Sequence, residues 1–321
     1  MWKYILKRLI TMVAMVLVVS FLVYMLMSLS PGDPVRAIAG ENLTPEQLEE
    51  LRESLGYNDP AIVRYFRYMK GVFQGDFGET LHGGKAVLSE YLSRLPRTLQ
   101  LAGFSILLVI IFAIPFGIIA AVKHNSIWDT ALSATAMCGL SVPSFWLGLM
   151  LIIGFALKLG WFPTSGSDQG FLSLILPSVT VAFANIALST RITRSSMLDA
   201  LRMDYLRTAR AKGVSELKVV TKHAFKNALI PIVTIVGSQF CTMFNSAFVI
   251  ESLFAWPGVG TLTLTAIRNN DANLVTGCVI LTTILTALTV LLVDVLYAYI
   301  DPRVKSQYTA GSVKKLRAKA K

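Results

Sequence analysis

The stretch TLQLAGFSILLVIIFAIPFGIIAAV, from Thr98 to Val122, contains no Asp, Glu, Lys or Arg in its 25 residues. A helix needs about 20 consecutive, mostly apolar residues to cross the hydrocarbon core of a bilayer, which is roughly 30 Å thick. The stretch is therefore long enough and apolar enough to span a membrane. It predicts a transmembrane helix, and with it an all-α membrane protein instead of a soluble domain.

Five further stretches have the same character. Four carry no charged residue and one contains only Asp294; they are residues 9–32, 130–157, 171–190, 228–250 and 274–297. The whole chain of 321 residues is 54% apolar and 15% charged, whereas soluble domains are about 45–50% apolar with about a quarter of their residues charged. We therefore predict a polytopic fold with about six transmembrane helices.

The first apolar run follows Lys3, Lys7 and Arg8, as the apolar region of a signal peptide would. A cleaved signal has an apolar region of about 7–15 residues that ends at an A-x-A-like site. The run here is longer, and residues 25–30 (MLMSLS) contain no such site. We expect an uncleaved transmembrane helix over residues 1–30.

The distribution of Lys and Arg predicts the orientation, because segments rich in these residues stay on the cytoplasmic side. With six spans, the N-terminus, residues 123–129 and 191–227, and the tail 301–321 share one side and carry 20 Lys/Arg against 5 acidic residues. The segments on the other side carry 10 Lys/Arg against 12 acidic residues. Both termini are therefore expected in the cytoplasm. The net charge of +11 reflects this topology beside anionic lipid and predicts no nucleic-acid partner.

Residues 31–97 are interpreted as a helical extracytoplasmic insert. The stretch 44–47 (TPEQ) combines an N-cap, a proline at the first helical position and a glutamine three residues after the cap, which predicts a helix start. A second helix is expected from near Pro60. Its apolar face comprises Ile62, Phe66, Met69 and Phe73. This face either packs against other parts of the chain or forms a docking platform for an external partner.

No catalytic or metal-binding pattern is recognisable in the sequence. The three cysteines fall inside predicted spans without a CxxC pair, and the three histidines are scattered, so we expect neither a disulfide nor a metal site. Residues 83–85 (GGK) look like part of a phosphate-binding loop. That loop needs G-x-x-x-x-G-K-[ST], however, and Glu79 and Ala86 occupy two of its required positions. We therefore expect the chain to bind no cofactor and to hydrolyse no ATP.

The inner segment 191–227 carries more charge than a simple connector requires. Apolar residues recur at helical spacing before Tyr205, and Gly213 is placed to end the helix that follows. A second helical piece is expected from Glu216 to Asn227. The pattern predicts a helix–turn–helix on the cytoplasmic face. On periodicity alone, it could insert into a groove of a partner or lie on anionic headgroups.

This segment also carries a family resemblance. Residues 207–213 (RTARAKG) and 223–231 (HAFKNALIP) resemble the cytoplasmic EAA loop of ATP-binding-cassette (ABC) importer permeases. RTA stands where the general pattern has Glu-Ala-Ala, and the distance to the proline is longer than in sugar importers; both departures are typical of the peptide and nickel class. Further motifs of this class follow in order: PGDP (31–34), GDFG (75–78), LP (176–177), RITRSSM (191–197), FAWPGVG (254–260), VDVLY (293–297) and DPR (301–303).

The resemblance implies a type I ABC importer permease in the bacterial cytoplasmic membrane. In such importers the loop fits a cleft of a separate ATPase subunit, and closure of two ATPases on ATP moves the spans between inward-open and outward-open states. The implied partners are a second, related permease in a heterodimer, two ATPase subunits that bind ATP and Mg, and an extracytoplasmic solute-binding protein. The implied domain layout is a first helix (1–30), the insert (31–97), a transmembrane domain (98–300) with a coupling loop (191–229), and a basic tail (301–321).

The resemblance also assigns the coupling residues. The docking helix is expected over residues 204–213, where the cations would meet polar groups of the ATPase and the alanines would permit close approach. The expected coupling residues are Tyr205, Arg207, Thr208, Ala209, Arg210, Ala211, Lys212, Gly213, His223, Asn227 and Pro231.

The segment after the fifth span combines a tryptophan, a proline and two glycines. These residues are typical of a tight reversal whose tryptophan lies at the membrane interface. The resemblance adds that the segment lies beside the translocation pathway. Candidates for an outer gate are therefore Trp256, Pro257, Gly258 and Gly260, with a plain interfacial turn as the alternative.

Asp294 is the ionisable residue that lies well inside a predicted span. Intramembrane charges are costly and are a functional hypothesis by default. No further buried acid or base is recognised that would support proton coupling. We therefore expect Asp294 to pair with a basic residue of the inner loop, such as Arg191 or Arg194.

The resemblance predicts a permease subunit of an ATP-driven importer of di- or oligopeptides. Nickel or a metal–metallophore complex is the alternative cargo within the same class, because the sequence shows no concentration of ligand residues that separates the two. An ion-coupled secondary transporter is disfavoured by the scarcity of buried ionisable residues and by the elaborate inner loop. A membrane-embedded enzyme is disfavoured by the lack of a catalytic pair.

Overall fold

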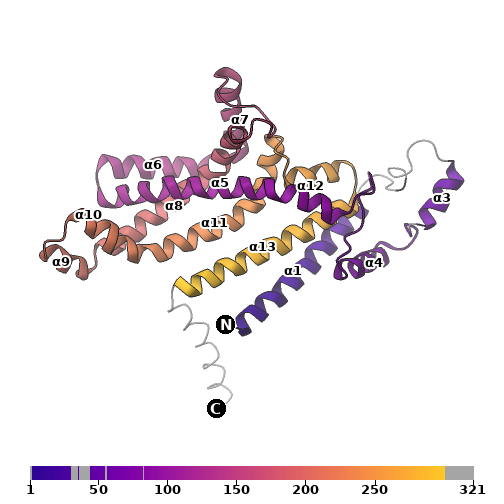
Figure 1. Ribbon diagram of the computed structural model, residues 1–321, viewed down its shortest axis with the longest axis horizontal. Coiled ribbons are helices and arrows are strands. Elements are labelled where there is room, and N and C mark those ends of the chain that lie inside the picture. The colour runs from indigo at the N-terminus through magenta and orange to yellow at the C-terminus, as the bar shows by residue number, and fades with distance from the viewer. Residues whose placement is uncertain (1, 30–34, 36–43, 55, 82, 301–321) are drawn as a thin grey trace, which may run out of the picture. The chain divides into compact units, whose positions relative to one another are not determined.

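The computed structural model describes residues 2–29, 35, 44–54, 56–81 and 83–300 (Figure 1). The basic tail 301–321 and the PGDP motif (Val35 follows it) lie outside the described residues. Helices dominate the described part. They are α1 (Trp2–Ser28), α3 (Pro45–Ser54), α4 (Ala61–Phe73), α5 (Val87–Val122), α6 (Ile127–Ser141), α7 (Ser144–Leu151), the π-helix η1 (Ile152–Lys158), α8 (Phe171–Leu201), α9 (Asp204–Ala211), α10 (Glu216–Lys218), the π-helix η2 (Val219–Ala224), α11 (Phe225–Leu253), α12 (Val259–Arg268) and α13 (Ala272–Ile300).

Five helical stretches of the described chain are long and apolar enough to cross a membrane, and one bent pair of helices adds a sixth if it is counted as one span. The five are Arg8–Ser28, Val87–Val122, Phe171–Leu201, Glu216–Phe244 and Ala272–Val295. Counted in this way, the described residues contain the six spans that the sequence predicts.

The third predicted span, residues 130–157, is not one straight helix. Its two parts, Ile127–Ser141 and Ser144–Lys158, are bent by 102°. Pro143 lies at the break, and Val142 before it is extended, with φ −85° and ψ 122°. Proline disfavours the helical conformation of the preceding residue and offers no N–H to the helix. The length of an apolar run does not reveal such a break.

The chain divides into two compact units. Unit 1 comprises Met1–Thr98 and Pro257–Leu291, and unit 2 comprises Leu99–Trp256 and Leu292–Lys321. Residues 257–291 therefore belong with the N-terminal part of the chain. The domain layout expected from the sequence instead placed them in one transmembrane domain with residues 98–256. Helices α5 and α13 contribute to both units.

In unit 1, α4 packs along α1. The Tyr65 hydroxyl donates to the Leu17 carbonyl at 3.1 Å and lies 3.0 Å from Ser20 Oγ. Met69 is buried beside them. The contacts place α4 against the C-terminal half of α1.

The predicted apolar face of α4 is covered by the chain only in part. Met69 is buried, and so is Tyr65 beside it, whereas Ile62, Phe66 and Phe73 are exposed. The start of α3 agrees with the sequence: Thr44 Oγ1 accepts from the Gln47 N–H at 3.3 Å, and Gln47 Oε1 accepts from the Thr44 N–H at 3.0 Å. This reciprocal pair is a capping box.

In unit 2, α8 packs against both α6 and α11. Small residues permit close contact: a Cβ at Gly117 of α5 would lie 2.4 Å from Thr193 Cβ, and one at Gly139 of α6 would lie 3.2 Å from Ala187 Cβ. Such positions let membrane helices approach each other closely. The core of unit 2 thus holds α8 firmly, and α8 leads directly into the inner loop.

Candidate functional site

Helix α9 follows α8 after a sharp change of direction. α8 ends at Leu201, and Met203 is extended, with φ −73° and ψ 140°. α9 then runs over Asp204–Ala211. It begins where the predicted docking helix begins, and it ends two residues earlier than the predicted end at residue 213. In Figure 1, α9 and α10 lie together at one end of unit 2.

The end of α9 requires a glycine. Gly213 has φ +78°, a left-handed conformation in which a Cβ is unfavourable. The Gly213 N–H donates to the Arg210 carbonyl at 2.9 Å, and the Val214 N–H donates to the Ala209 carbonyl at 3.3 Å. These bonds satisfy carbonyls at the helix end. The sequence-based expectation that Gly213 ends the helix agrees with this geometry.

A buried cluster lies directly behind α9. Leu206 is fully buried, and it belongs to the same core as Met197 of α8 and Val219 of η2. Ala209 packs against this cluster from the same face of α9. The polar face of α9 is turned the other way. The helix is therefore fixed to unit 2 through its apolar face.

Hydrogen bonds join α9 to the second half of the loop. Asn227 Nδ2 donates to the Tyr205 hydroxyl at 2.5 Å, and this hydroxyl donates to the His223 carbonyl at 3.3 Å. Arg210 donates to both carboxylate oxygens of Glu216, through Nε at 3.0 Å and Nη2 at 2.8 Å. Four of the predicted coupling residues are thus in direct contact within the loop.

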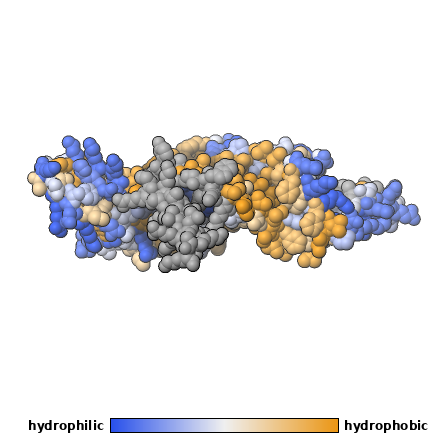
Figure 2. All heavy atoms as spheres, turned by 90° about the horizontal axis from the view of Figure 1, so that it is seen from below, coloured by the Kyte–Doolittle hydropathy of each residue, from blue (hydrophilic) through white to orange (hydrophobic). Residues whose placement is uncertain are grey.

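Four of the other predicted coupling residues form an exposed surface, which we call the α9 surface. The side chain of Arg207 is 81% exposed and lies 3.7 Å from that of Asp204, which is 94% exposed, and such an exposed pair contributes little to stability. The α9 surface comprises Arg207, Thr208, Ala211 and Lys212, together with the exposed apolar residues Met203 and Leu217. Figure 2 shows hydrophilic side chains gathered over the end of the molecule that carries α9 and α10.

Two expectations about individual coupling residues change. Ala209 faces the core of unit 2, so of the two alanines only Ala211 is exposed on the α9 surface. Arg210 is engaged with Glu216 and is not a free cation. Pro231 lies inside α11 and is exposed there.

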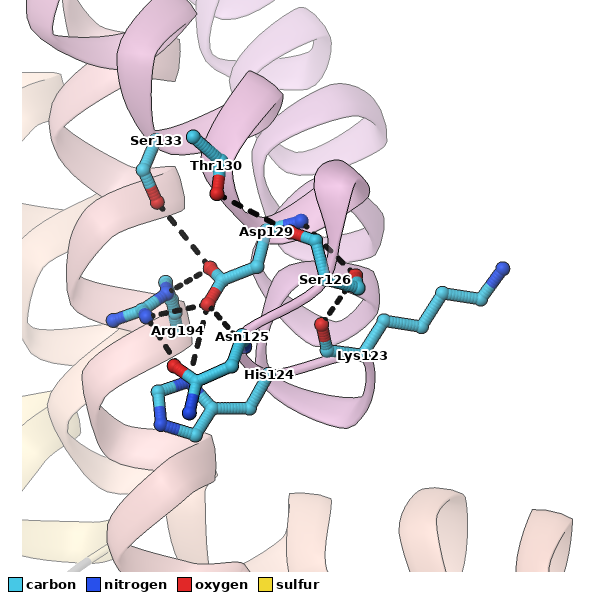
Figure 3. Close-up of polar contacts among 8 residues, drawn as sticks. All are labelled: Lys123, His124, Asn125, Ser126, Asp129, Thr130, Ser133 and Arg194. Carbon is cyan, nitrogen blue, oxygen red and sulfur yellow. Dashed lines mark hydrogen bonds and ion pairs between the residues drawn. The ribbon is translucent and has the colours of Figure 1, made fainter.

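A second polar cluster, which the sequence analysis missed, lies where α8 approaches α6 (Figure 3). Asp129, in the first turn of α6, is 4% exposed. Arg194 of α8 donates to both of its oxygens, through Nε at 2.5 Å and Nη2 at 2.7 Å. The Asn125 N–H donates to the same carboxylate at 3.0 Å, and His124 Nδ1 lies 3.1 Å from it. The carboxylate is therefore fully enclosed by donors.

Local geometry positions Asp129. Asn125 has a left-handed backbone, with φ 62°, which asparagine tolerates better than most residues. Ser126 is the N-cap of α6 and accepts from the Asp129 N–H at 3.4 Å. An acidic residue in the first helical turn also interacts favourably with the helix dipole. The S-x-x-D spacing at Ser126 was the available signal for this site.

The expected pairing of Asp294 with Arg194 is wrong, because Arg194 binds Asp129. Arg191 is exposed on α8. Asp294 is half-buried in unit 2, and its role stays a prediction.

The segment 256–260 crosses from one unit to the other. Trp256 closes the long segment of unit 2 and Pro257 begins the second segment of unit 1. Trp256 is fully buried against Leu101, Leu174 and Ala247, so its ring packs in the core of unit 2, and its position at the membrane interface stays a prediction. Gly258 and Gly260 are also buried. A contribution of this segment to an outer gate stays a prediction.

Within the described residues, no group of three or more His, Cys, Asp or Glu side chains could hold a metal ion. The coupling loop and the Asp129–Arg194 cluster contain no arrangement of nucleophile and base. The described residues of this site thus present no catalytic constellation.

Comparison with known families identifies the class of protein. Residues 113–306 match the model of the binding-protein-dependent transport system inner membrane component, and residues 1–102 match the model of the N-terminal part of these membrane components. The chain belongs to this family. It is a multi-pass inner-membrane permease component of an ABC importer, of the peptide and nickel class. Such permeases are transport components and not enzymes, and they work with ATPase and binding-protein partners.

Individual relatives agree with this class. The chain is 40% identical over 306 residues to the glutathione transport system permease protein GsiC of Escherichia coli K12, which covers 95% of this chain and 99% of the relative. GsiC of Salmonella paratyphi A is 41% identical over the same length. A solved structure of the inward-facing MetNI methionine ABC transporter aligns with a TM-score of 0.56 at 18% identity, over 67% of this chain and 97% of that chain. This structure supports the fold.

Proposed function

We propose that this chain is one half of a permease heterodimer that imports short peptides, and that its α9 surface docks on one of two ATPase subunits. The observation that carries the proposal is the two-sided arrangement of α9. Its apolar face is fixed by the core around Leu206, whereas its polar face stays exposed. An exposed amphipathic helix fits a groove of a partner, and the fixed face would pass a movement of that partner to α8.

The Asp129–Arg194 ion pair supports the coupling role. It joins the first turn of α6 to α8 only ten residues before α9 begins. A displacement of α9 would therefore reach α6 as well as α8. Energetic coupling between distant places is carried by such contiguous polar and packed contacts. We infer that Arg194 and Asp129 act as positioning residues of the coupling pathway.

The same ion pair supports the proposed orientation. Asp129 belongs to segment 123–129 and Arg194 to segment 191–227, and the charge pattern places both segments in the cytoplasm. Their direct contact requires them to lie on the same side of the membrane. We propose that these segments and both termini are cytoplasmic. ATP and Mg would be bound by the partner ATPases and not by this chain.

Short peptides are proposed as the cargo because the curated relatives are glutathione permeases of similar length. Glutathione is itself a small peptide. The binding protein would deliver the peptide on the external side, and a second, related permease would complete the pathway.

Reconstitution of the complete importer tests the coupling role. Arg207→Glu and Ala211→Trp alter the exposed face of α9 without touching its buried face. We expect both variants to lower peptide uptake, peptide-stimulated ATP hydrolysis and co-purification of the ATPase together. Arg268→Glu, the same charge reversal at an exposed position at the end of α12, should retain the ATPase. Normal uptake and ATPase retention in both α9 variants would contradict the proposal.

Cysteine labelling in intact cells tests the orientation. Cys138 is exposed, whereas Cys241 and Cys278 are buried, so Cys138→Ser provides the background. In that background, an impermeant reagent should label Ser54→Cys in α3 and leave Ser215→Cys in the loop unlabelled until the cells are opened. The reverse pattern would overturn the proposed topology.

A further inference from the structure

A cavity of about 270 Å³ lies within unit 1. Its wall combines α4, the segment from Asp76 to Leu81, the first turn of α13 at Asn273, and Tyr24 of α1. Pockets for drug-sized ligands are about 300–1,000 Å³. The cavity is therefore large enough for a small molecule of few atoms.

Arg64 brings an uncompensated positive charge to this cavity. Its guanidinium stacks over the ring of Tyr57, with Cζ 5.1 Å from the ring centroid. No carboxylate of the described chain pairs with it, and its buried Nε has no acceptor there. Arg67 also lines the cavity, but its charge is compensated because it forms an ion pair with Asp59. Leaving a buried donor without an acceptor costs free energy. An anionic ligand at Arg64 would supply the missing acceptor.

Tyr68 supplies a second donor on the same wall. It is one helical turn after Arg64, and residues four apart lie on the same face of a helix. Its hydroxyl is buried and has no hydrogen-bond partner in the described part of the chain. Burial raises the pKa of Tyr68 above its ordinary value, so the hydroxyl keeps its proton and remains a donor. Two donors without acceptors thus line one cavity.

Asp76 lines the same cavity with the opposite charge. Its Oδ1 accepts from the Gly78 N–H at 2.8 Å, which fixes the carboxylate at the turn. The cavity thus offers a cation and a phenol for a carboxylate, and a separate carboxylate for an ammonium group. This set of charges is complementary to a zwitterion.

We propose that the cavity binds a small zwitterion with a free carboxylate and a free ammonium group, and specifically a short peptide. The carboxylate is held by Arg64 and Tyr68, and the ammonium group lies toward Asp76. The zwitterion chemistry follows from the cavity, whereas the choice of a peptide rests on the proposed function. The site shares no residue with the α9 surface.

The arrangement of α4 argues against a phospholipid as the ligand. The exposed apolar residues Ile62 and Phe66 are each two positions from Arg64. Residues two apart on a helix point about 200° apart, because each residue turns by 100°. A lipid phosphate bound at Arg64 would therefore direct its acyl chains away from this apolar flank.

Ligand-observed NMR on the purified importer in nanodiscs, without ATP, tests the proposal. The probes are dialanine, its C-terminal amide and its N-acetyl derivative. We expect dialanine to bind roughly tenfold more tightly than the amide, as expected for loss of one charge-assisted contact. Arg64→Gln should abolish this difference, and Arg64→Lys should keep part of it. Tyr68→Phe should weaken dialanine binding several-fold, and Asp76→Asn should remove the preference over the N-acetyl probe.

Arg52→Gln is the matched control, because Arg52 lies outside the cavity lining and forms an ion pair with Glu49; this variant should leave the preference for the free acid intact. Equal binding of dialanine and its amide to the unaltered importer would overturn the proposal. So would unchanged discrimination in Arg64→Gln, or a loss of copurifying phospholipid in this variant without any change in dialanine binding. Thermal unfolding of each variant identifies a failure to fold. Arg207→Glu should bind dialanine normally, so a failure of the coupling role is distinguishable from a failure of this site.

Discussion

Helices α9 and α4 are both amphipathic, but they differ in how much of their apolar surface the rest of the chain buries. α9 turns Leu206 into the core of unit 2 and exposes its cations. α4 buries Tyr65 and Met69 against α1 but leaves a second apolar flank, with Ile62 54% exposed. Periodicity therefore identifies the two faces of a helix. Which face becomes covered depends on the rest of the chain and on the membrane or partners around it.

The largest expected effect concerns the ion pair that holds α8 in front of α9. Asp129→Ala leaves the Arg194 guanidinium without its carboxylate. Removing one partner of a buried pair costs about 3–5 kcal/mol, and the value here should lie near the lower end because the Arg194 side chain is 27% exposed. Denaturant unfolding in detergent measures the loss. We expect peptide uptake to fall together with the free energy of unfolding, because α8, which leads into α9, loses its ion pair with α6.

The double variant Asp129→Ala/Arg194→Met provides the control for this prediction. Replacing both members of a buried pair by apolar groups is often neutral for stability. We therefore expect the free energy of unfolding to recover largely in the double variant. If stability recovers while uptake remains low, the ion pair has a coupling role beyond stability. A single variant as stable as the parent would show that the pair does not hold α8.

The next effect concerns the buried face of α9. Leu206→Ala removes a fully buried side chain and should lower the free energy of unfolding by about 2–5 kcal/mol. The same substitution at Leu217, which is 74% exposed, should change it by less than about 0.5 kcal/mol. The same unfolding measurement compares the two. Equal effects would mean that α9 is not anchored by the core.

The sequence was sufficient for the features that depend on local chemistry. Apolar runs predicted the spans, the spacing at Thr44 and Gln47 predicted the capping box, and Gly213 predicted the end of a helix. Each of these depends on residues close together in the chain. The RTARAKG stretch, together with the ordered series of further motifs along the chain, also indicated the class of permease.

The features that the sequence did not reveal depend on contacts between distant residues. Asp129 and Arg194 are 65 positions apart, and no local pattern links them. The burial of Trp256 depends on three helices that meet around it. Whether the apolar face of α4 is covered was left open by the sequence, because periodicity does not show that Tyr65 contacts α1 while Phe66 stays exposed.

A smaller effect is expected at the end of α9. Gly213→Ala places a Cβ on a left-handed residue, which costs about 1–2 kcal/mol. No atom lies within 4 Å of that Cβ position, so the cost is conformational and not steric. Gly103→Ala is the matched control, because Gly103 lies in α5 with equally open space and no left-handed backbone. Helix propensity favours alanine there, so the control should be neutral or stabilising in thermal unfolding.

The smallest effect should occur on the exposed flank of α4, and it tests the other half of the comparison. Ile62→Thr exchanges an exposed apolar side chain for a polar one with similar helix propensity, so the free energy of unfolding in detergent should change by less than about 0.5 kcal/mol. Tyr65→Phe, only three residues away, removes the hydroxyl that contacts Leu17 and Ser20 and should cost about 1 kcal/mol. The order of the two effects matters more than their size. If Ile62→Thr costs as much as Tyr65→Phe, the flank is covered in the folded chain and the contrast with α9 fails. If Ile62→Thr leaves the free energy of unfolding unchanged in detergent but lowers it in bilayers, lipid covers the flank, as expected for an amphipathic helix at a membrane interface.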